Sequence, residues 1–468
     1  GVERNVVITM WDWADPRAYQ HDIVSTDRRD PTVNADGPVY GALEASADYI
    51  PVLDPESHTA SQVPLVFRDP PPSIGSMQEG FASSPYWADE AIWNSRGNVH
   101  NPMLDQEGRV WFTQAVGPAD NPEFCREGSD HPAAQLYPLE RAGRHVSMYD
   151  PPTEEFTLVR TCFSTHHLMF AEDEDNTLWT SGGGQVVGWV NTRMLLETGD
   201  EEAAQGWTAL IMDTNGNGQR DAYVEPNQPV DPTMDKRFGG AFYAVSPAPD
   251  GSVWGTHLSY PGAVIRLDPG DNPPETALAE VYELPLGPDG NPVEGFGPRG
   301  GDVDRNGVFW VALASGHMAS LDRSKCTGPL NGPDATGQHC PEGWTFYTEP
   351  LPQVQGVDLP GSAEASYYTW VDQFDVAGFG ENTPINTGNG AEGLLVLDDG
   401  EWVTLRVPYP AGYYTKWMDG RIDDPNGGWK GRGLWTTVST RTPFHMEGGK
   451  GTTSQVVHFQ MRPDPLAK

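Results

Sequence analysis

Residues 100–111 read His100-Asn-Pro-Met-Leu-Asp-Gln-Glu-Gly-Arg-Val-Trp111. A short apolar run leads into a turn that contains Asp and Gly, and a Trp then lies in a second apolar run. Alternating apolar residues on both sides of such a turn specify a β-hairpin. We interpret the segment as the two inner strands of a four-stranded sheet.

The same phrase recurs along the chain. Further copies are His166–Trp179, Tyr243–Trp254 and Arg299–Trp310, and Gly433-Leu-Trp435 is a weaker fifth copy. A phrase repeated every several tens of residues is typical of a repeat fold. The last gap has room for two blades, and one more blade fits before Trp111. The pattern therefore predicts an all-β chain, a seven-bladed β-propeller with long loop insertions; six or eight blades are the alternatives.

The two ends of the chain and the long last gap complete this scheme. Residues 5–11 and 455–460 both have strand patterns, and their pairing in one blade would close the ring and leave no exposed sheet edge. In the last gap, the missing copy is expected around 367–370 and 393–397. A propeller grows by adding blades that pack on their neighbours, so one domain over 1–468 is predicted.

Three segments are expected to depart from the regular blades. Residues 12–83 form the longest irregular stretch, which we interpret as a segment that wraps over one face, with structural padding as the simpler alternative. Residues 200–237 form an insertion with a calcium-type loop. Residues 326–340 form a Gly- and Pro-rich loop with a cysteine at each end.

The charge of the chain excludes two classes of partner. It has 66 Asp and Glu against 29 Lys and Arg, which gives a formal net charge of −37. A surface this negative repels nucleic acid and anionic membranes, so neither is expected as a partner. The scarcity of Lys fits a marine or halophilic source. No apolar run is long enough to span a bilayer, so no membrane insertion is expected.

The four cysteines form two local pairs. We predict disulfides between Cys125 and Cys162 and between Cys326 and Cys340, because an even number of cysteines in such a chain fits an oxidising compartment. Four free thiols in a cytosolic protein are the alternative. The chain starts at Gly1 without a Met, which fits a mature secreted or periplasmic protein whose signal peptide has been removed.

The sharpest local motif predicts a calcium site. It reads Asp213-Thr-Asn215-Gly-Asn217-Gly-Gln219-Arg-Asp221. Alternating oxygen-bearing side chains with a Gly at the sixth position wrap a hard cation, as in the first half of an EF-hand loop. The glutamate that usually stands at position twelve is absent, so the loop is a shortened version of that motif. Its expected role is structural, and a plain Asn-Gly turn is the alternative.

The histidines carry the functional prediction. His100 and His166 stand at the start of the innermost strand in successive blades, and Tyr243 and Arg299 occupy the equivalent positions in the next two. Further histidines follow the repeated Trp at the end of the second strand, namely His257, His317 and His445. The start of the first strand and the loop after the second emerge on one face of a propeller. The five histidines are therefore expected to converge on one site.

Imidazole is a common ligand of Cu, Fe and Zn, so the convergent histidines predict a transition metal with positions open for a small-molecule substrate. His167, Tyr243, Arg299 and Glu447 are the candidate catalytic residues, and Asp372 and Lys450 are further acid–base candidates. A histidine in a β-rich protein can equally be structural. That interpretation is given to the six that fit no such position, which are His21, His58, His131, His145, His339 and His458.

The repeated phrase, together with Ile265-Arg-Leu-Asp-Pro269, resembles the seven-bladed propellers of the virginiamycin B lyase (streptogramin lyase) superfamily. The likeness covers four or five blades. It implies a metal-dependent carbon–oxygen lyase in which His257, His317 or His445 would be the general base beside Mg²⁺. Residues 429–435 and 442–450 also resemble a group of secreted bacterial propeller proteins, a likeness that implies no activity.

Three functions from different classes therefore follow from the sequence. The first is an oxidoreductase with Cu or Fe held by histidines at the axis. The second is a metal-dependent lyase or hydrolase with a His general base. The third is a non-catalytic propeller that binds a carbohydrate or a protein partner. The substrate and the oligomeric state are not specified by the sequence.

Overall fold

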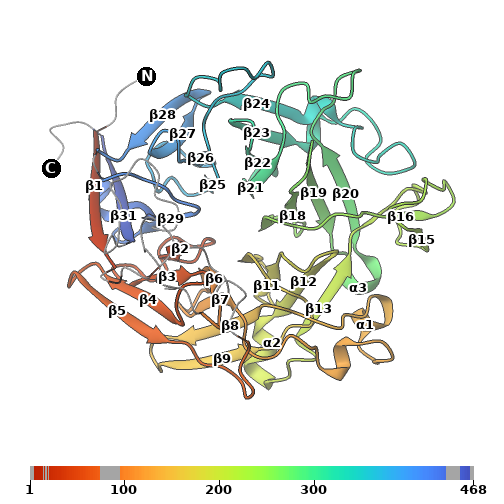
Figure 1. Ribbon diagram of the computed structural model, residues 1–468, viewed down its shortest axis with the longest axis horizontal. Helices are drawn as coiled ribbons and strands as arrows, with labels where there is room; N and C mark the ends of the chain where they lie inside the picture. Colours follow the sequence, from red (N-terminus) through yellow and green to blue (C-terminus); the bar gives the residue numbers. More distant parts are fainter. Residues whose placement is uncertain are drawn as a thin grey trace. The chain divides into compact units, whose positions relative to one another are not determined.

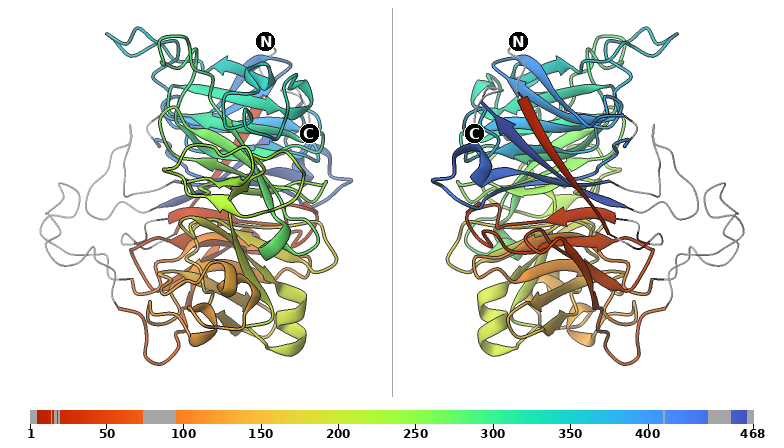
Figure 2. Two further views of the ribbon diagram at one scale, coloured as in Figure 1. Left: turned by 90° about the vertical axis from the view of Figure 1, so that its right-hand side faces the viewer. Right: turned by 90° about the vertical axis from the view of Figure 1, so that its left-hand side faces the viewer.

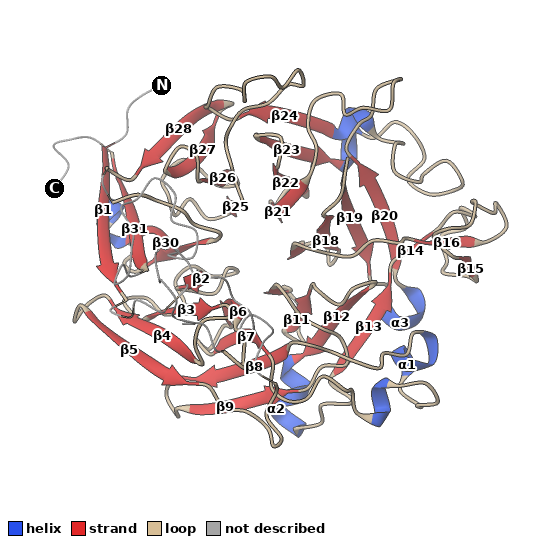
Figure 3. Ribbon diagram, viewed as in Figure 1, coloured by secondary structure: helices blue, strands red, loops and turns tan. Residues whose placement is uncertain are grey.

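The structure is a computed structural model, and it describes residues 5–13, 15, 18, 20–73, 95–409, 411–438 and 454–463. Strands dominate these residues, with a few short helices (Figure 3). The chain forms two compact units that are interleaved in sequence. Unit 1 contains Gly1–Pro118, Arg144–Arg160 and Asp372–Lys468, and unit 2 contains Ala119–Gly143 and Thr161–Val371.

Unit 1 contains three complete four-stranded sheets. The first is β2 (Gln20–Val24), β3 (Val39–Leu43), β4 (Tyr49–Asp54) and β5 (Thr59–Pro64). The second is β6 (His100–Leu104), β7 (Val110–Gln114), β8 (His145–Asp150) and β9 (Glu155–Val159). The third has the order β29 (Met418–Ile422), β30 (Arg432–Val438), β31 (Gln455–Arg462) and β1 (Asn5–Asp12). A further sheet has the order β25 (Thr369–Asp372), β26 (Thr383–Gly388), β27 (Gly393–Asp398) and β28 (Glu401–Arg406).

Unit 2 also contains three complete four-stranded sheets. They are β10 (Leu168–Phe170), β11 (Thr177–Thr180), β12 (Val186–Asn191) and β13 (Gln205–Ala209); β17 (Val245–Pro247), β18 (Val253–His257), β19 (Ala263–Asp268) and β20 (Leu278–Glu283); and β21 (Pro298–Val303), β22 (Val308–Leu313), β23 (His317–Asp322) and β24 (Trp344–Thr348). A three-stranded sheet has the order β14 (Ile211–Met212), β16 (Asp235–Arg237) and β15 (Tyr223–Val224). Short helices are α1 (Pro132–Leu136), α2 (Thr192–Thr198) and α3 (Pro273–Thr276).

The consecutive four-stranded antiparallel sheets confirm the all-β propeller class. The repeated phrase has a physical explanation within these sheets. All five predicted Trp residues lie on the second strand of a sheet, on β7, β11, β18, β22 and β30. In the first copy, one carboxylate oxygen of Asp105 accepts a hydrogen bond from Arg109 N at 3.0 Å, and the other accepts one from Trp111 Nε1 at 2.8 Å. Asp304 has the same role towards Trp310. In these two copies the Asp thus closes the turn and accepts a hydrogen bond from the indole nitrogen, whereas Ser252 Oγ accepts it from Trp254 in a third copy.

The first and last strands pair as predicted. β1 and β31 are antiparallel neighbours, with Asn5 opposite Arg462 and Asp12 opposite Gln455. Figures 1 and 2 show these two strands, which are at opposite ends of the sequence, lying side by side. The last sheet of unit 1 therefore takes three strands from the C-terminal part of the chain and one from the N-terminal part. The number of blades in a closed ring stays a prediction.

The interpretation of 12–83 as an irregular wrapping segment is wrong for residues 20–64. These residues form the complete sheet β2–β5. Its second strand carries Tyr40 where five of the other sheets carry Trp, and Tyr40 pairs with Val24 across a connection that is much longer than a tight turn. The blade was therefore hidden because both parts of the repeated phrase are missing from it.

Buried aspartates connect the innermost strands of neighbouring sheets within each unit. In unit 1, Asp22 on β2 accepts a hydrogen bond from Asn101 N on β6 at 3.1 Å, and Asp419 on β29 accepts one from Ser25 N at 2.8 Å. In unit 2, Asp302 on β21 accepts one from Val371 N at 2.9 Å. These carboxylates satisfy backbone N–H groups at positions where no strand pairs with the inner edge of a sheet.

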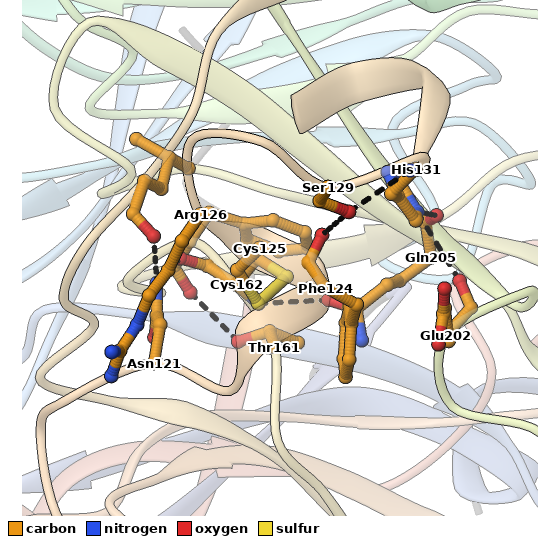
Figure 4. The surroundings of a disulfide bond; sticks show 12 residues. Asn121, Phe124, Cys125, Arg126, Ser129, His131, Thr161, Cys162, Glu202 and Gln205 are labelled. Carbon is orange, nitrogen blue, oxygen red and sulfur yellow. Dashed lines mark hydrogen bonds between the residues drawn. A yellow bond between two sulfur atoms is a disulfide. The ribbon is translucent and has the colours of Figure 1, made fainter. Parts of the chain in front are cut away.

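Both predicted disulfides are present, and both lie in unit 2. Cys125 bridges Cys162, and Cys326 bridges Cys340. Around the first bridge, Asn121 Nδ2 donates to the carbonyl oxygen of Cys162 at 2.6 Å, and Cys162 N donates to Gln205 Oε1 at 2.8 Å (Figure 4). The bridge thus ties the excursion at 119–143 to β13. Two disulfides are compatible with an extracellular location.

The hydrogen bonds of His131, which lies in the same region, fit a structural role for this residue. Its Nε2 lies 3.2 and 3.1 Å from the carbonyl oxygens of Glu202 and Gln205, while its Nδ1 accepts a hydrogen bond from Ala133 N (Figure 4). Both ring nitrogens are thus used within the fold.

None of the described helices has the length and apolar character needed to cross a membrane.

Candidate metal centre

Two histidines from neighbouring innermost strands meet in unit 1. His21 is the second residue of β2, and His100 is the first residue of β6. Their ring centroids lie 3.9 Å apart at an angle of 62°. Both side chains are almost fully buried, with exposures of 2% and 0%. Two imidazoles held this close inside the protein form the core of the site.

Glu44 completes a group of three potential metal ligands. It follows the end of β3, and its Oε2 lies 3.5 Å from His21 Nε2. The ligand atoms offered by His21, Glu44 and His100 all lie within 4.8 Å of one another. Glu44 is 20% exposed, so the group is open to solvent on the glutamate side.

The carboxylate of Asp22 lies next to both imidazoles. Its Oδ1 lies 2.9 Å from His21 Nδ1, and its Oδ2 lies 3.9 Å from His100 Nε2. The carboxylate is fixed by the hydrogen bond from Asn101 N, a residue with a left-handed backbone at φ 41°. A carboxylate against Nδ1 keeps the proton on that nitrogen and leaves Nε2 as the lone-pair side of the ring.

Two cationic side chains border the group. Lys416 Nζ lies 3.1 Å from His21 Nε2, and the ring nitrogen accepts this hydrogen bond because an ammonium group can only donate. Arg144, which precedes β8, places Nη1 3.9 Å from Glu44 Oε1. Burial lowers the pKa of Arg144, and Glu44 and Asp22 oppose that shift. The site thus combines two carboxylates, two imidazoles and two cations.

Unit 2 contains a second cluster, which is rich in aromatic rings. His166 and His167 precede β10, and their ring centroids lie 4.1 Å apart. His167 Nδ1 lies 2.7 Å from the carbonyl oxygen of Tyr243, which can only accept, so Nδ1 carries a proton and donates this hydrogen bond. Tyr368 contacts the edge of the same imidazole at 5.6 Å.

Tyrosine and arginine side chains extend this cluster. Tyr243 Oη donates to Tyr367 Oη at 2.7 Å, and the guanidinium of Arg299 lies over the ring of Tyr367 at 4.7 Å. Burial, and then the neighbouring Tyr367, raises the pKa of Tyr243 well above its ordinary value. The phenol therefore stays neutral at physiological pH and can act as a hydrogen-bond donor but not as a base. His166, His167 and Tyr243 thus form one cluster of rings, which Tyr367 extends to Arg299.

His257 and His317 have local partners of their own. His257 ends β18, contacts the edge of the Phe238 ring at 5.2 Å and accepts a long hydrogen bond from Ala241 N. His317 begins β23, the third strand of its sheet, and its Nδ1 lies 3.0 Å from Ser315 Oγ. Among the described residues, neither histidine belongs to a group of three potential metal ligands.

Other predicted residues lie elsewhere or outside the described residues. His445, Glu447 and Lys450 fall in residues 439–453, outside the described part of the chain. Asp372 is buried and accepts hydrogen bonds from the backbone N–H groups of Val376 and Ala377 at 2.9 and 2.7 Å, so its carboxylate closes a turn. Burial raises the pKa of Asp372 to about 6.

The calcium-type loop in unit 2 curls around its last residue. Asn215 Nδ2 and Asn217 Nδ2 both donate to Asp221 Oδ2, at 3.0 and 2.7 Å, and these two bonds lower the pKa of Asp221. Asp213 accepts hydrogen bonds from the backbone of the loop, and Gln219 N donates to Asn217 Oδ1 at 2.8 Å. All five residues predicted for this site therefore lie in one turn.

No sequence pattern marks the residues that surround His100. His21 fits no repeat position in the sequence because the sheet β2–β5 lacks the repeated phrase. With that sheet in place, His21 stands near the start of an innermost strand, where His100 also stands, and the same positional rule would have selected it. No comparable signal marks Glu44, Arg144 or Lys416, which lie outside the strands and whose proximity arises only from folding.

No family model matches the chain, and no curated protein matches it. Among solved structures, YCF48 bound to D1 peptide is similar at 11% identity and a TM-score of 0.47, over 99% of this chain and 97% of that one. The extracellular domain of the one component system BT4673 from B. thetaiotaomicron has 12% identity and a TM-score of 0.44, over 99% of this chain and 44% of that one. A chain of the Mitotic Checkpoint Complex has 9% identity and a TM-score of 0.44, over 99% of this chain and 92% of that one. Likenesses this distant carry no inference about activity, and membership of the virginiamycin B lyase superfamily stays a prediction.

Proposed function

We propose that the protein is a metalloenzyme whose ion is held by His21, Glu44 and His100. The observation that carries this proposal is the position of two imidazoles and one carboxylate with their ligand atoms within 4.8 Å of one another. Two histidines and one carboxylate form the donor set of mononuclear non-haem iron sites and of many catalytic zinc sites. Three protein ligands would leave further positions for a substrate.

This donor set narrows the choice of metal. A carboxylate beside two imidazoles is a donor set that suits Fe²⁺ or Zn²⁺. Copper is expected in a site with more histidines. Iron would supply redox chemistry, and the first function is therefore an iron-dependent oxidoreductase. Zinc would supply a Lewis acid, as a lyase or hydrolase requires. Asp22 supports either ion, because it holds His21 with the lone pair of Nε2 facing Glu44.

Lys416 and Arg144 define what such a centre would accept. Lys416 donates to the same His21 nitrogen that would bind the ion, so its flexible side chain must swing aside when a metal enters. The displaced ammonium and the guanidinium of Arg144 would then stand beside the ion. Two cations at this position favour a small anionic substrate, such as a carboxylate, over a neutral one.

One observation favours a second function, a non-catalytic binding propeller. Without an ion, Asp22 and Glu44 are already balanced by Lys416 and Arg144, and His21 is bound on both sides. This closed network also stabilises the contact between the sheets β2–β5 and β6–β9. The metalloenzyme requires a bound ion at this site, and the binding propeller does not.

Metal analysis of the purified protein distinguishes them. We expect about one iron or zinc per chain, falling below about one tenth in His100→Ala, because removing one of three ligands removes most of the affinity. His58→Asn is the matched control: this histidine is exposed, and asparagine tolerates its left-handed backbone. Calcium is counted separately. Absence of stoichiometric transition metal from the wild-type protein, both as purified and after addition of Fe²⁺ or Zn²⁺, would favour the binding propeller.

A further inference from the structure

The three-stranded sheet of unit 2 brings three aspartates to one end. Asp213 follows β14, Asp221 lies two residues before the start of β15, and Asp235 begins β16. In the register, Met212 lies opposite Lys236, and Tyr223 lies opposite Asp235. The loop and Asp235 therefore lie at the same end of these strands, although Asp235 is distant from the loop motif in sequence.

Asp235 is the unusual member of this group. It is fully buried at 0% exposure, and its Oδ2 accepts a hydrogen bond from Asp221 N at 2.7 Å. Its Oδ1 is buried and has no hydrogen-bond partner. Burial, together with the charges of Asp213 and Asp221, raises its pKa. A buried carboxylate oxygen without a partner, beside two further carboxylates, is costly unless a cation lies against it.

We propose that Asp235 completes a Ca²⁺ site formed with Asp213, Asn215, Asn217 and Asp221. Carboxylate and amide oxygens are the ligands that this hard cation prefers, and the carbonyl of Gln219 supplies a further oxygen in loops of this kind. In the structure the two Asn side chains turn their NH₂ groups towards Asp221, where they supply the positive ends of dipoles. A bound ion takes over that role once the amides rotate and present their oxygens.

The site joins two insertions that are far apart in sequence. Asn331 Nδ2 donates to Asp213 Oδ2 at 3.0 Å, and Gly332 N donates to the carbonyl oxygen of Asp213 at 2.7 Å. Both donors belong to the loop that the Cys326–Cys340 disulfide closes. Calcium at Asp213 thus stabilises the contact between the 200–237 insertion and the 326–340 loop. The ion has a structural role and is independent of the His21 centre.

Calorimetric titration of the chelator-treated full-length protein with CaCl₂ tests this site. In about 0.15 M KCl, which screens the many surface carboxylates, we expect one saturable site with a Kd below about 1 mM. Asp235→Asn is expected to raise the Kd at least tenfold, since it removes one of three charges. Asp221→Asn is expected to have a similar effect, and it serves as a second variant because Asp221 is exposed. Asp231→Asn is the control and should bind as the wild type does, because Asp231 is a half-buried aspartate of the same insertion whose side chain bonds to Thr233 rather than to the loop.

Proteolysis supplies an independent measurement. Lys325 precedes the disulfide-closed loop and is 56% exposed, so trypsin can reach it. Calcium should slow cleavage after Lys325 at least several-fold in the wild type and in Asp231→Asn, but not in Asp235→Asn. A wild-type protein without a saturable site would overturn the proposal. Wild-type affinity in both Asp235→Asn and Asp221→Asn would show that the carboxylates are structural and that calcium binds elsewhere.

Discussion

Replacement of Asp419 by alanine is expected to lower the free energy of unfolding by about 3–5 kcal/mol. Asp419 lies on β29 and is 3% exposed. Its Oδ2 accepts hydrogen bonds from Ser25 N, Ser25 Oγ and Thr26 N at 2.8, 3.0 and 3.1 Å. Alanine would leave these donors buried without an acceptor, and unsatisfied buried donors each cost about 1–3 kcal/mol.

Urea unfolding followed by tryptophan fluorescence measures this effect. Asp358→Ala is a suitable control because Asp358 is exposed in a loop, so its removal should change stability by no more than about 0.5 kcal/mol. Asp419→Asn should fall between the two, since its amide can still accept but presents a donor to the same N–H groups. Equal stability of the Asp419→Ala and Asp358→Ala variants would mean that the aspartate does not hold the two sheets together.

The repeated phrase predicted the fold well because it encodes a complete local structure. An Asp or Gly turn followed by Trp fixes a hairpin, and in the first copy Asp105 also accepts a hydrogen bond from the indole nitrogen of Trp111. The two sheets without this phrase show the limit of the pattern. The strand β26 carries Thr-Pro-Ile instead of Trp, and β3 carries Tyr40 after a long connection. The local sequence pattern therefore identifies neither sheet.

The candidate metal centre was only partly predictable for the same reason. His100 was found by its position on an innermost strand, whereas His21 was lost with its unrecognised sheet. The buried aspartates gave no signal at all. In a chain with 66 acidic residues, an Asp on a strand carries little information, and only the structure distinguishes Asp22 and Asp419 from the aspartates of the surface. Contacts between sheets depend on long-range packing that no local pattern encodes.

Buried histidines in this protein are expected to make it sensitive to mild acid. Burial lowers the pKa of His145 and of His458 to about 3, and that of His317 to about 4. An unfolded histidine titrates near pH 6.5, so each of these groups binds a proton more readily in the unfolded state. Stability is therefore fully present above about pH 6.5 and is lost as the pH falls towards the folded pKa. Each group contributes about 1.4 kcal/mol per pH unit in this window.

Two buried acids act in the opposite direction. Burial raises the pKa of Asp372 and of Asp419 to about 6, so the folded protein takes up protons there before the unfolded chain does. Between about pH 6 and pH 4 these two groups favour folding as the pH falls, while the three histidines oppose it. The net charge of −37 adds a further stabilising term on acidification, because repulsion between surface carboxylates weakens.

A substitution at His145 isolates one histidine from these opposing terms. His145 is fully buried at 0% exposure, and the nearby charges of Arg160 and Arg68 further disfavour its protonation. Above pH 7 the His145→Gln variant should be less stable than the wild type by a constant amount. From pH 6.5 to pH 5 that difference should shrink by about 2 kcal/mol, because only the wild type loses stability by protonation of this imidazole on unfolding. Urea unfolding at half-unit steps from pH 8 to pH 5 measures it. Parallel curves for the two proteins across this range would mean that His145 does not contribute to acid lability.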